Sequence, residues 1–270
     1  MPRQKRVLSP TQIYHIMVRG NSGRDIFIED EDRQKLLKII INKNREKEFN
    51  IYAYCLMDNH FHLVLKEQKN NVSHIMKKIN TTYAIYFNKK YQLNGHLFQD
   101  RFKSEIVESD DYFLAVIRYI HNNPVKAGLV SLPQEYKWNS YSWYVKPNSN
   151  SNKIVNVEDP LRLFSDDLSQ ARSRFIEFSQ LREEKYKFLE YKDNDKSKKE
   201  LDTDLKIKYF RDQFLRRNKI TLDCLSDRRN KVLRDKLIQE LQEKSIYSNR
   251  EIAEFLKMGR GMVESAGRRK

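Results

Sequence analysis

The chain has 270 residues, which is enough for one large domain or two modest ones with a proper core. Lysine and arginine number 52 against 37 acidic residues, so the formal net charge is +15. That surplus indicates a polyanionic partner, with nucleic acid favoured over an anionic membrane. No apolar run approaches the roughly 20 residues of a spanning helix, and the N-terminus MPRQKRVLSP lacks the apolar core of a signal peptide.

Two further counts narrow the class of protein. Cys55 and Cys224 are the only cysteines and form no CxxC pair, so a disulfide framework and a cysteine zinc site are disfavoured. The expected location is therefore the reducing cytoplasm, with the nucleoid favoured by the charge. Neither GxGxxG nor a P-loop motif occurs, which argues against nucleotide hydrolysis of the P-loop type.

The first half of the chain alternates strand and helix signals. Periodicity and turn residues predict strands at 12–20, 50–57, 60–66 and 101–107, and helices at 29–48, 73–91 and 109–124. Asp58-Asn59 forms the two-residue turn of a hairpin. Ser109 is expected to cap the last helix and Pro124 to end it. The order predicts an α+β fold, a ferredoxin-like split βαβ arrangement with an antiparallel sheet and one extra helix.

The second half is predicted to be helical and separate. Residues 146–156 read as an exposed linker, helical signal returns at 158–185, and a charged stretch covers 191–204. The expected domains are a core at 1–145, a linker and helical extension at 146–204, and a helical DNA-binding region at 205–270. In that region Ser248 and Glu251 make a capping box, and Ile252, Ala253, Leu256 and Val263 lie at positions typical of a helix-turn-helix. A basic helical tail is the alternative.

The hairpin YCLMDNHFHLVL places His60 and His62 one residue apart on a strand. Residues i and i+2 share a face, so both imidazoles project together while Phe61 points to the other face. Two such rings bind one divalent cation with open positions left for other ligands. The alternative is two polar residues on a solvent-facing strand, and the spacing alone does not decide.

The helix at 109–124 supplies further candidates. At 3.6 residues per turn, Tyr112, Tyr119 and Asn123 fall on one face beside an apolar stripe. Asn123 offers an amide oxygen to a metal, and Tyr119 offers a phenol oxygen to an electrophile. The alternative is that the tyrosines are amphipathic packing residues and that Asn123-Pro124 only stops the helix.

Several motifs carry a family resemblance. HFH after an apolar strand, GHLFQDRFKSEIV, AVIRYIHNNPVKAGLV and YKWNSYSWY together resemble single-tyrosine HUH transposases, nearest to the REP-associated tyrosine transposases, over roughly residues 10–145. The resemblance implies an HUH endonuclease core in which His60, His62 and Asn123 bind the metal. It also implies that Tyr119 is the nucleophile, and Tyr112 is the second choice.

The implied reaction is metal-dependent cleavage and rejoining of single-stranded DNA through a 5′-phosphotyrosine intermediate, on hairpin or repeat DNA. This chemistry conserves the phosphodiester energy and needs no ATP. Mg²⁺ or Mn²⁺ suits the ligand set. The alternatives are a non-catalytic, transposase-derived DNA-binding regulator and a metal-dependent hydrolase without a covalent intermediate. Relatives include dimers and monomers, so a homodimer is left open.

Basic residues are the expected contacts to DNA phosphates, and the charge surplus predicts salt-sensitive binding. The candidates are Arg19, Arg24, Arg101, Lys103, Lys126 and Lys137 in the core and Arg260, Arg268, Arg269 and Lys270 at the C-terminal end. A position near the site is one interpretation of His15 and His96, and a structural or surface role is favoured for both.

Overall fold

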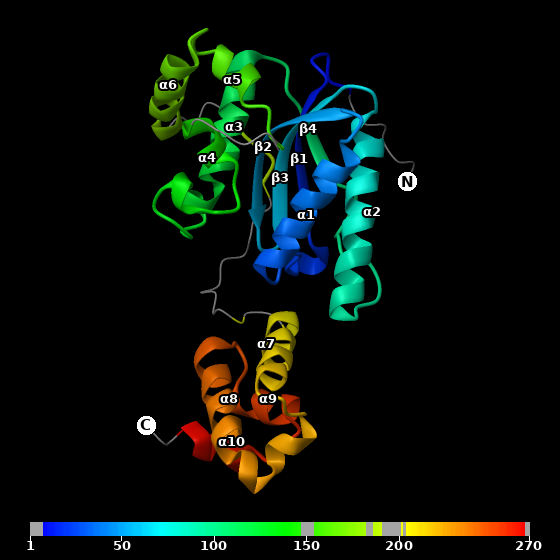
Figure 1. Cartoon of the computed structure of the whole chain (residues 1–270), viewed down its shortest axis with the longest axis vertical. Helices are drawn as coiled ribbons and strands as arrows, with labels where there is room; N and C mark the ends of the chain where they lie inside the picture. The colour runs from blue at the N-terminus through cyan, green and yellow to red at the C-terminus, as the bar shows by residue number, and fades with distance from the viewer. Residues whose placement is uncertain (1–7, 147–153, 182–185, 191–200, 202–203, 268–270) are drawn as a thin grey trace. The chain divides into compact units, whose positions relative to one another are not determined.

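The protein is represented by a computed structural model that describes residues 8–146, 154–181, 186–190, 201 and 204–267 (Figure 1). It divides into two compact units, residues 1–191 and 192–270, which are described one at a time. Parts of several predictions lie outside the described residues. These are the N-terminal segment 1–7, most of the linker at 147–153, most of the charged stretch at 191–200 and 202–203, and Arg268, Arg269 and Lys270.

The first unit is built on one antiparallel sheet. Its strands lie in the order β2-β3-β1-β4, which is the order of a ferredoxin-like split βαβ fold. All four strands arise where the hydrophobic pattern predicts them, and the predicted α+β class is confirmed. The strands are β1 (Ile13–Arg19), β2 (Phe49–Met57), β3 (His60–Glu67) and β4 (Lys103–Ile106).

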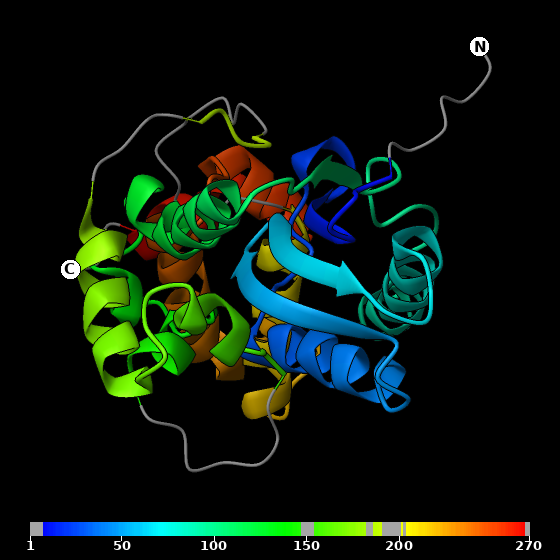
Figure 2. The same cartoon turned by 90° about the horizontal axis from the view of Figure 1, so that it is seen from above.

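Helices cover both faces of this sheet. On one face lie α1 (Asp30–Lys43) and α2 (Val72–Tyr91), and Phe61 of β3 meets Phe27 there. On the other face lies α3 (Asp110–Lys126), whose Tyr119 meets His62 of the same strand (Figure 2). Successive residues of β3 therefore point to opposite layers, as the period of two requires.

Hydrogen bonds and an ion pair from other segments of the chain hold the turn between β2 and β3 in place. The carbonyl of Asp58 accepts hydrogen bonds from the backbone N–H groups of Ile26 (2.8 Å) and Phe27 (3.0 Å), and its carboxylate pairs with Arg33. The carbonyl of Asn59 accepts from the Gly20 N–H at 2.8 Å. A β-carbon at Gly20 would lie 2.0 Å from the Arg24 carbonyl oxygen, so only glycine fits this close approach. These contacts fix where β3 begins, and therefore where His60 lies.

The C-terminal end of α3 differs from the prediction. Ser109 caps α3 as expected, because its side chain accepts from the Tyr112 N–H. The expectation that Pro124 ends the helix is wrong, since α3 continues to Lys126. A proline in the last turn lacks one N–H donor but leaves the other bonds of that turn intact. The Ala127 N–H still donates to the Asn123 carbonyl, and the Leu129 N–H closes the end on the Pro124 carbonyl, both at 3.0 Å.

A small helical layer completes the first unit around His121 of α3. The ring of His121 is fully buried against aromatic side chains, and its Nε2 lies 2.8 Å from Ser140 Oγ. Burial lowers the pKa of His121 to about 3. This layer contains α4 (Tyr141–Val145), α5 (Glu158–Arg162) and α6 (Leu168–Gln180), and short 3-10 turns lie at Asn21–Gly23 and Pro133–Glu135.

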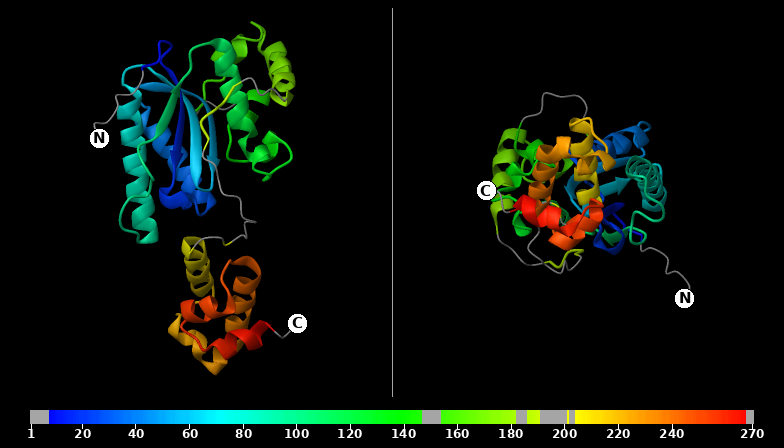
Figure 3. Two further views of the ribbon diagram at one scale, coloured as in Figure 1. Left: turned by 180° about the vertical axis from the view of Figure 1, so that it is seen from behind. Right: turned by 90° about the horizontal axis from the view of Figure 1, so that it is seen from below.

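The second unit is entirely helical in its described part (Figure 3). Ile252, Ala253 and Val263 are buried in its aliphatic core, as the helix-turn-helix prediction requires. Ser248 and Glu251 form the predicted capping box, and Lys257 in the turn has a left-handed φ of 54°. The helices are α7 (Asp204–Arg217), α8 (Lys231–Lys244), α9 (Asn249–Phe255) and α10 (Arg260–Gly267), with 3-10 turns at Asp223–Ser226 and Arg228–Asn230.

No helix in the described parts of the two units is both long enough and apolar enough to cross a membrane.

Candidate active site

The paired histidines lie at the start of β3, on the face covered by α3. Their side chains are not solvent-facing, because His60 is 9% exposed and His62 is 1% exposed. The two ring centroids are 5.2 Å apart, and the planes are nearly perpendicular. The interpretation of the pair as polar residues on an open strand face is therefore wrong.

A hydrogen-bonding side chain lies beside the Nδ1 atom of each imidazole. The Nδ1 of His60 lies 2.6 Å from the Asn59 amide oxygen, and the Nδ1 of His62 lies 3.0 Å from the Nε2 of His15. With a proton on Nδ1, the neutral imidazole of His62 presents Nε2 as its acceptor atom. The Nε2 of His62 is buried and has no hydrogen-bond partner in the described structure.

A chain of polar groups continues behind His62. His15 is fully buried on β1, and its Nδ1 lies 3.7 Å from a carboxylate oxygen of Glu105 on β4. Burial lowers the pKa of His15, against the opposing effect of Glu105. Burial also lowers the pKa of His62, and the neighbouring His60 and His15 add to that effect. A neutral His15 that carries its proton on Nδ1, toward the Glu105 carboxylate, leaves its Nε2 as an acceptor for the Nδ1–H of His62.

Tyr119 lies directly over these histidines. Its ring centroid is 5.8 Å from that of His15 and 5.8 Å from that of His62, with edge-on geometry in both cases. Burial raises the pKa of the Tyr119 hydroxyl and the Glu190 carboxylate raises it further, whereas the amide of Asn123, one helical turn later, acts in the opposite direction. The hydroxyl is therefore protonated at neutral pH in this arrangement.

A segment distant in sequence covers the tyrosine. The ring of Phe188 stacks on Tyr119 at 4.4 Å between centroids, and the Tyr119 hydroxyl donates to the Leu189 carbonyl at 3.2 Å. Tyr112 is held by the same segment, because its ring stacks on Phe188 at 5.8 Å and meets Tyr186 edge-on at 5.0 Å. We call residues 186–190 the covering segment.

A metal ion at this position would need donor atoms from several side chains. Among the described residues, no group of three His, Cys, Asp or Glu side chains is arranged to hold a metal ion. The side chain of Asn123 lies close enough to Tyr119 to lower the pKa of its hydroxyl. Its Nδ2 is buried without a hydrogen-bond partner in the described part of the chain. Two imidazole nitrogens and one amide oxygen suit a divalent ion that keeps further open positions.

The predicted basic residues are distributed unevenly around the site. Arg19 is directly opposite His60 in the β1–β3 register, and Lys103 is opposite Met17 on the neighbouring strand. The Lys126 ammonium lies 4.7 Å from the Tyr119 ring centroid and 3.9 Å from a Glu190 oxygen. The remaining candidates are exposed: Arg24 and Arg101 near the sheet edge, Lys137 paired with Asp30, and Arg260 paired with Glu264 in the second unit.

Sequence reasoning missed His15, Glu105 and the covering segment. The strand period places His15 on the same face as Arg19, which is a signal that points toward the site. It does not identify His62 as the contact, because that requires the register between β1 and β3.

The comparison with known proteins concerns the part of the chain that forms the sheet and most of α3. Residues 9–123 match the family model described as IS200-like transposase. This segment is similar to the IS200-like transposases. The matched segment, called the transposase segment below, contains the whole sheet and ends at Asn123, so all four predicted catalytic and metal-site residues lie within it.

Two relatives of the transposase segment carry related names. A REP-associated tyrosine transposase of Haemophilus influenzae is 27% identical over 110 residues, which cover 36% of this chain and 62% of the relative. The chain therefore spans somewhat less than two thirds of that relative's length. A solved structure of a REP-associated tyrosine transposase bound to a REP hairpin has a TM-score of 0.47 and 20% identity, covering 58% of this chain and 94% of that chain.

Proposed function

We propose that the first unit is a transposase that cleaves and rejoins single-stranded DNA with Tyr119 as the nucleophile. The observation that carries this proposal is the position of the Tyr119 ring, 5.8 Å from the ring of His62, whose buried Nε2 has no hydrogen-bond partner among the described residues. Burying an unpaired polar atom costs folding free energy, and such groups are common at functional sites. Binding of a metal ion beside a nucleophile would account for this one.

The proposed reaction is a transesterification with balanced bonds. The Tyr119 oxygen attacks the scissile phosphorus, the bond to the 3′ oxygen breaks, and a 5′-phosphotyrosine and a free 3′-OH result. A second 3′-OH then attacks the phosphotyrosine and restores Tyr119. Each step exchanges one phosphate ester for another, so no nucleotide cofactor is required.

The protein side chains hold and orient the reacting groups. His60, His62 and Asn123 would bind a Mg²⁺ or Mn²⁺ ion, which would supply electrophilic stabilisation of the phosphate charge. Asn59 and His15 keep the two imidazoles in the tautomer that presents Nε2. Lys126, close to the Tyr119 ring, adds a positive charge where the phosphate has to approach.

The covering segment has to withdraw before this reaction begins. Phe188 and Leu189 occupy the space against the Tyr119 ring and hydroxyl that a DNA backbone would need. The pKa of Tyr119 is raised by burial in this arrangement, so opening also lowers the cost of forming the phenolate. We infer that the structure represents a resting state.

The second unit is proposed to bind duplex or hairpin DNA through its helix-turn-helix. The α9–turn–α10 arrangement has the buried contacts that this motif requires, and Arg260 is exposed at the start of α10. A hairpin or repeat substrate is supported by the similarity of the transposase segment to a REP-associated transposase.

The test is a denaturing gel of the full chain with 5′- and 3′-labelled single-stranded DNA from the region flanking the gene, including its hairpins. With Mn²⁺ we expect a covalent adduct that carries the DNA 3′ of the cut. Tyr119→Phe should abolish the adduct, lowering its yield at least a thousandfold, while DNA binding stays within about twofold.

The matched control is Tyr112→Phe, which removes the other hydroxyl on the same helical face and should leave the adduct. An adduct in Tyr119→Phe that is lost in Tyr112→Phe would exchange the two roles. Metal-dependent cleavage without an adduct would favour the hydrolase, and binding without cleavage would favour the DNA-binding regulator.

A further inference from the structure

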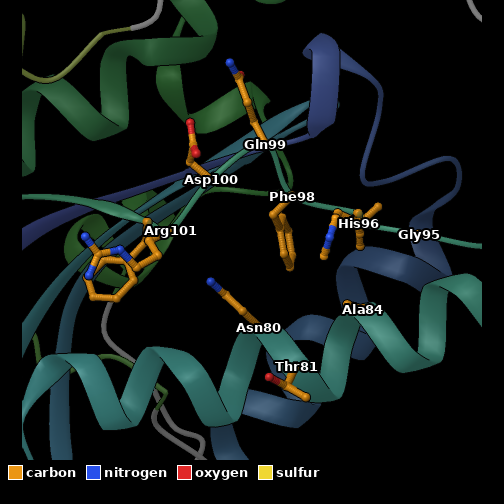
Figure 4. Close-up of a pocket in the computed structure, with 11 residues that line it drawn as sticks. Asn80, Thr81, Ala84, Gly95, His96, Phe98, Gln99, Asp100 and Arg101 are labelled. Carbon is orange, nitrogen blue, oxygen red and sulfur yellow. The ribbon is translucent and has the colours of Figure 1, made fainter. Parts of the chain in front are cut away.

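A pocket of the first unit lies at the sheet edge, outside the histidine cluster. It has a volume of about 780 Å³, within the roughly 300–1,000 Å³ typical of small-ligand sites. One wall is α2, and the other is the loop 95–102 that leads into β4 (Figure 4). The catalytic residues described above do not line it.

Aromatic and polar groups face each other in this pocket. The ring of Phe98 points toward α2, where it packs against Tyr83, and His96 lies beside it (Figure 4). Asn80 projects from α2 into the space between helix and loop. Its Oδ1 is buried and has no hydrogen-bond partner among the described residues, although a buried amide oxygen normally has one. This acceptor is unused, and Figure 4 shows the amide nitrogen toward the open space, so a donor on a ligand would meet the oxygen after the amide group rotates.

The sheet register places the loop 95–102 near the histidine pair across the sheet, although the α2 wall of the pocket belongs to the opposite face. Arg19 is paired with His60 on one side, and on its other side its carbonyl accepts from the Gln99 N–H at 3.0 Å. Gly20 and Phe98 also form a bridge. The loop is therefore two strand spacings from His60, about 10 Å. A DNA strand whose phosphate lies at His60 would pass Arg19 and reach this edge within a few nucleotides.

We propose that this pocket binds an unpaired nucleobase of the single-stranded DNA substrate. Phe98 would provide the stacking surface, Asn80 would accept a hydrogen bond from the base edge, and the exposed Arg101 at the rim would contact the backbone phosphate. Aromatic stacking with a polar edge contact and a nearby cation is the usual recognition of single strands. The inference rests on the proposed function for its substrate class.

The test measures binding without cleavage, in the Tyr119→Phe full chain. Two fluorescein-labelled ligands are compared by anisotropy: a dT 12-mer and an abasic 12-mer with the same backbone. A base contact predicts that Phe98→Leu weakens binding of the dT 12-mer about fivefold to hundredfold and changes binding of the abasic 12-mer less than twofold. Arg101→Gln should weaken both, because it acts on the phosphate.

Two further variants distinguish the loss of a base contact from a general folding defect. Asn80→Leu leaves the stacking ring in place and should also weaken only the dT 12-mer. Phe164→Leu makes the same side-chain change at a partly buried phenylalanine outside the pocket, and should leave both affinities unchanged. Unchanged dT 12-mer affinity in both Phe98→Leu and Asn80→Leu would overturn the proposal, as would equal losses for the two ligands in both variants.

The outcome is separable from that of the proposed function. If the wild-type chain forms no covalent adduct but the base-dependent losses are present, the transesterification is wrong and the pocket stands as a DNA-binding site. If the adduct forms and the losses are absent, the pocket proposal alone fails.

Discussion

The first unit buries polar side chains around its catalytic face, whereas the second unit buries almost none. His15, His62 and His121 are each at most 1% exposed in the first unit. In the described part of the second unit, Arg234 and Ser245 are the only buried polar residues, and the rest of its core is apolar. Each unmet buried polar group costs roughly 1–3 kcal/mol, so the first unit carries a cost that the second avoids.

This difference corresponds to the two proposed ways of acting on DNA. Covalent chemistry requires groups with fixed tautomers and restricted water access, which a buried network supplies. Binding of a DNA groove requires an exposed cationic surface on a rigid support, for which an aliphatic core is sufficient. The predictions below test this distinction, from the largest expected effect to the smallest.

The strongest test removes His15, the group behind the proposed metal site. His15→Phe preserves the ring but leaves the Nδ1 proton of His62 without its acceptor, so the ring is no longer held with Nε2 toward the metal. Removal of such an outer partner typically costs 10- to 100-fold in metal affinity. We expect that loss for Mn²⁺, measured by electron paramagnetic resonance. His96→Phe, at an exposed histidine, is the control, and equal Mn²⁺ affinities in the two variants would contradict the role of His15.

The buried His121 predicts a pH-dependent loss of stability. Its pKa is about 3 in the folded chain and about 6.5 when unfolded. Below pH 6.5 the unfolded chain therefore binds a proton that the folded chain does not, and stability falls as the pH falls from 6.5 toward 3. Between pH 7 and 5 this one residue should lower the free energy of unfolding by about 2 kcal/mol.

Urea unfolding at pH 7 and pH 5 measures this effect. His121→Gln retains a hydrogen-bonding group near Ser140 and cannot titrate, so the change in stability between the two pH values should shrink by about 2 kcal/mol relative to the wild type. The other buried histidines are the same in both proteins and cancel. An unchanged pH dependence would show that folding does not shift the pKa of His121.

The covering segment should restrain the nucleophile measurably. Phe188→Ala removes the ring that stacks on Tyr119, an interaction worth about 0.5–1.5 kcal/mol beyond the area it buries. The rate of adduct formation should rise about three- to tenfold. Lys187→Ala, at an exposed position of the same segment, should leave the rate unchanged. A slower rate in Phe188→Ala would indicate that Phe188 assists the reaction instead.

The smallest effect is expected in the second unit, where no buried network is involved. Lys257 has a left-handed φ of 54° in the turn between α9 and α10, a conformation that costs non-glycine residues about 1 kcal/mol. Lys257→Gly should raise the stability of this unit by up to about 1 kcal/mol in thermal unfolding. Lys257→Ala keeps the strain and serves as the control, so a comparable gain in both variants would exclude backbone strain as the cause.

The sequence by itself determined which segments form strands and helices and which side chains share a face. The alternation of β3 puts His60 and His62 together, and the helical period of α3 aligns Tyr119 with Asn123, because both patterns depend on local backbone geometry. The same is true of the Ser109 cap and the Ser248–Glu251 box.

Only the tertiary structure decided what surrounds those residues. The contact of His15 with His62 depends on the register of β1 against β3, and Glu105 joins them through β4. The covering segment meets Tyr119 across some 70 residues of chain. Such contacts are set by how whole layers pack, and local periodicity contains no information about that packing.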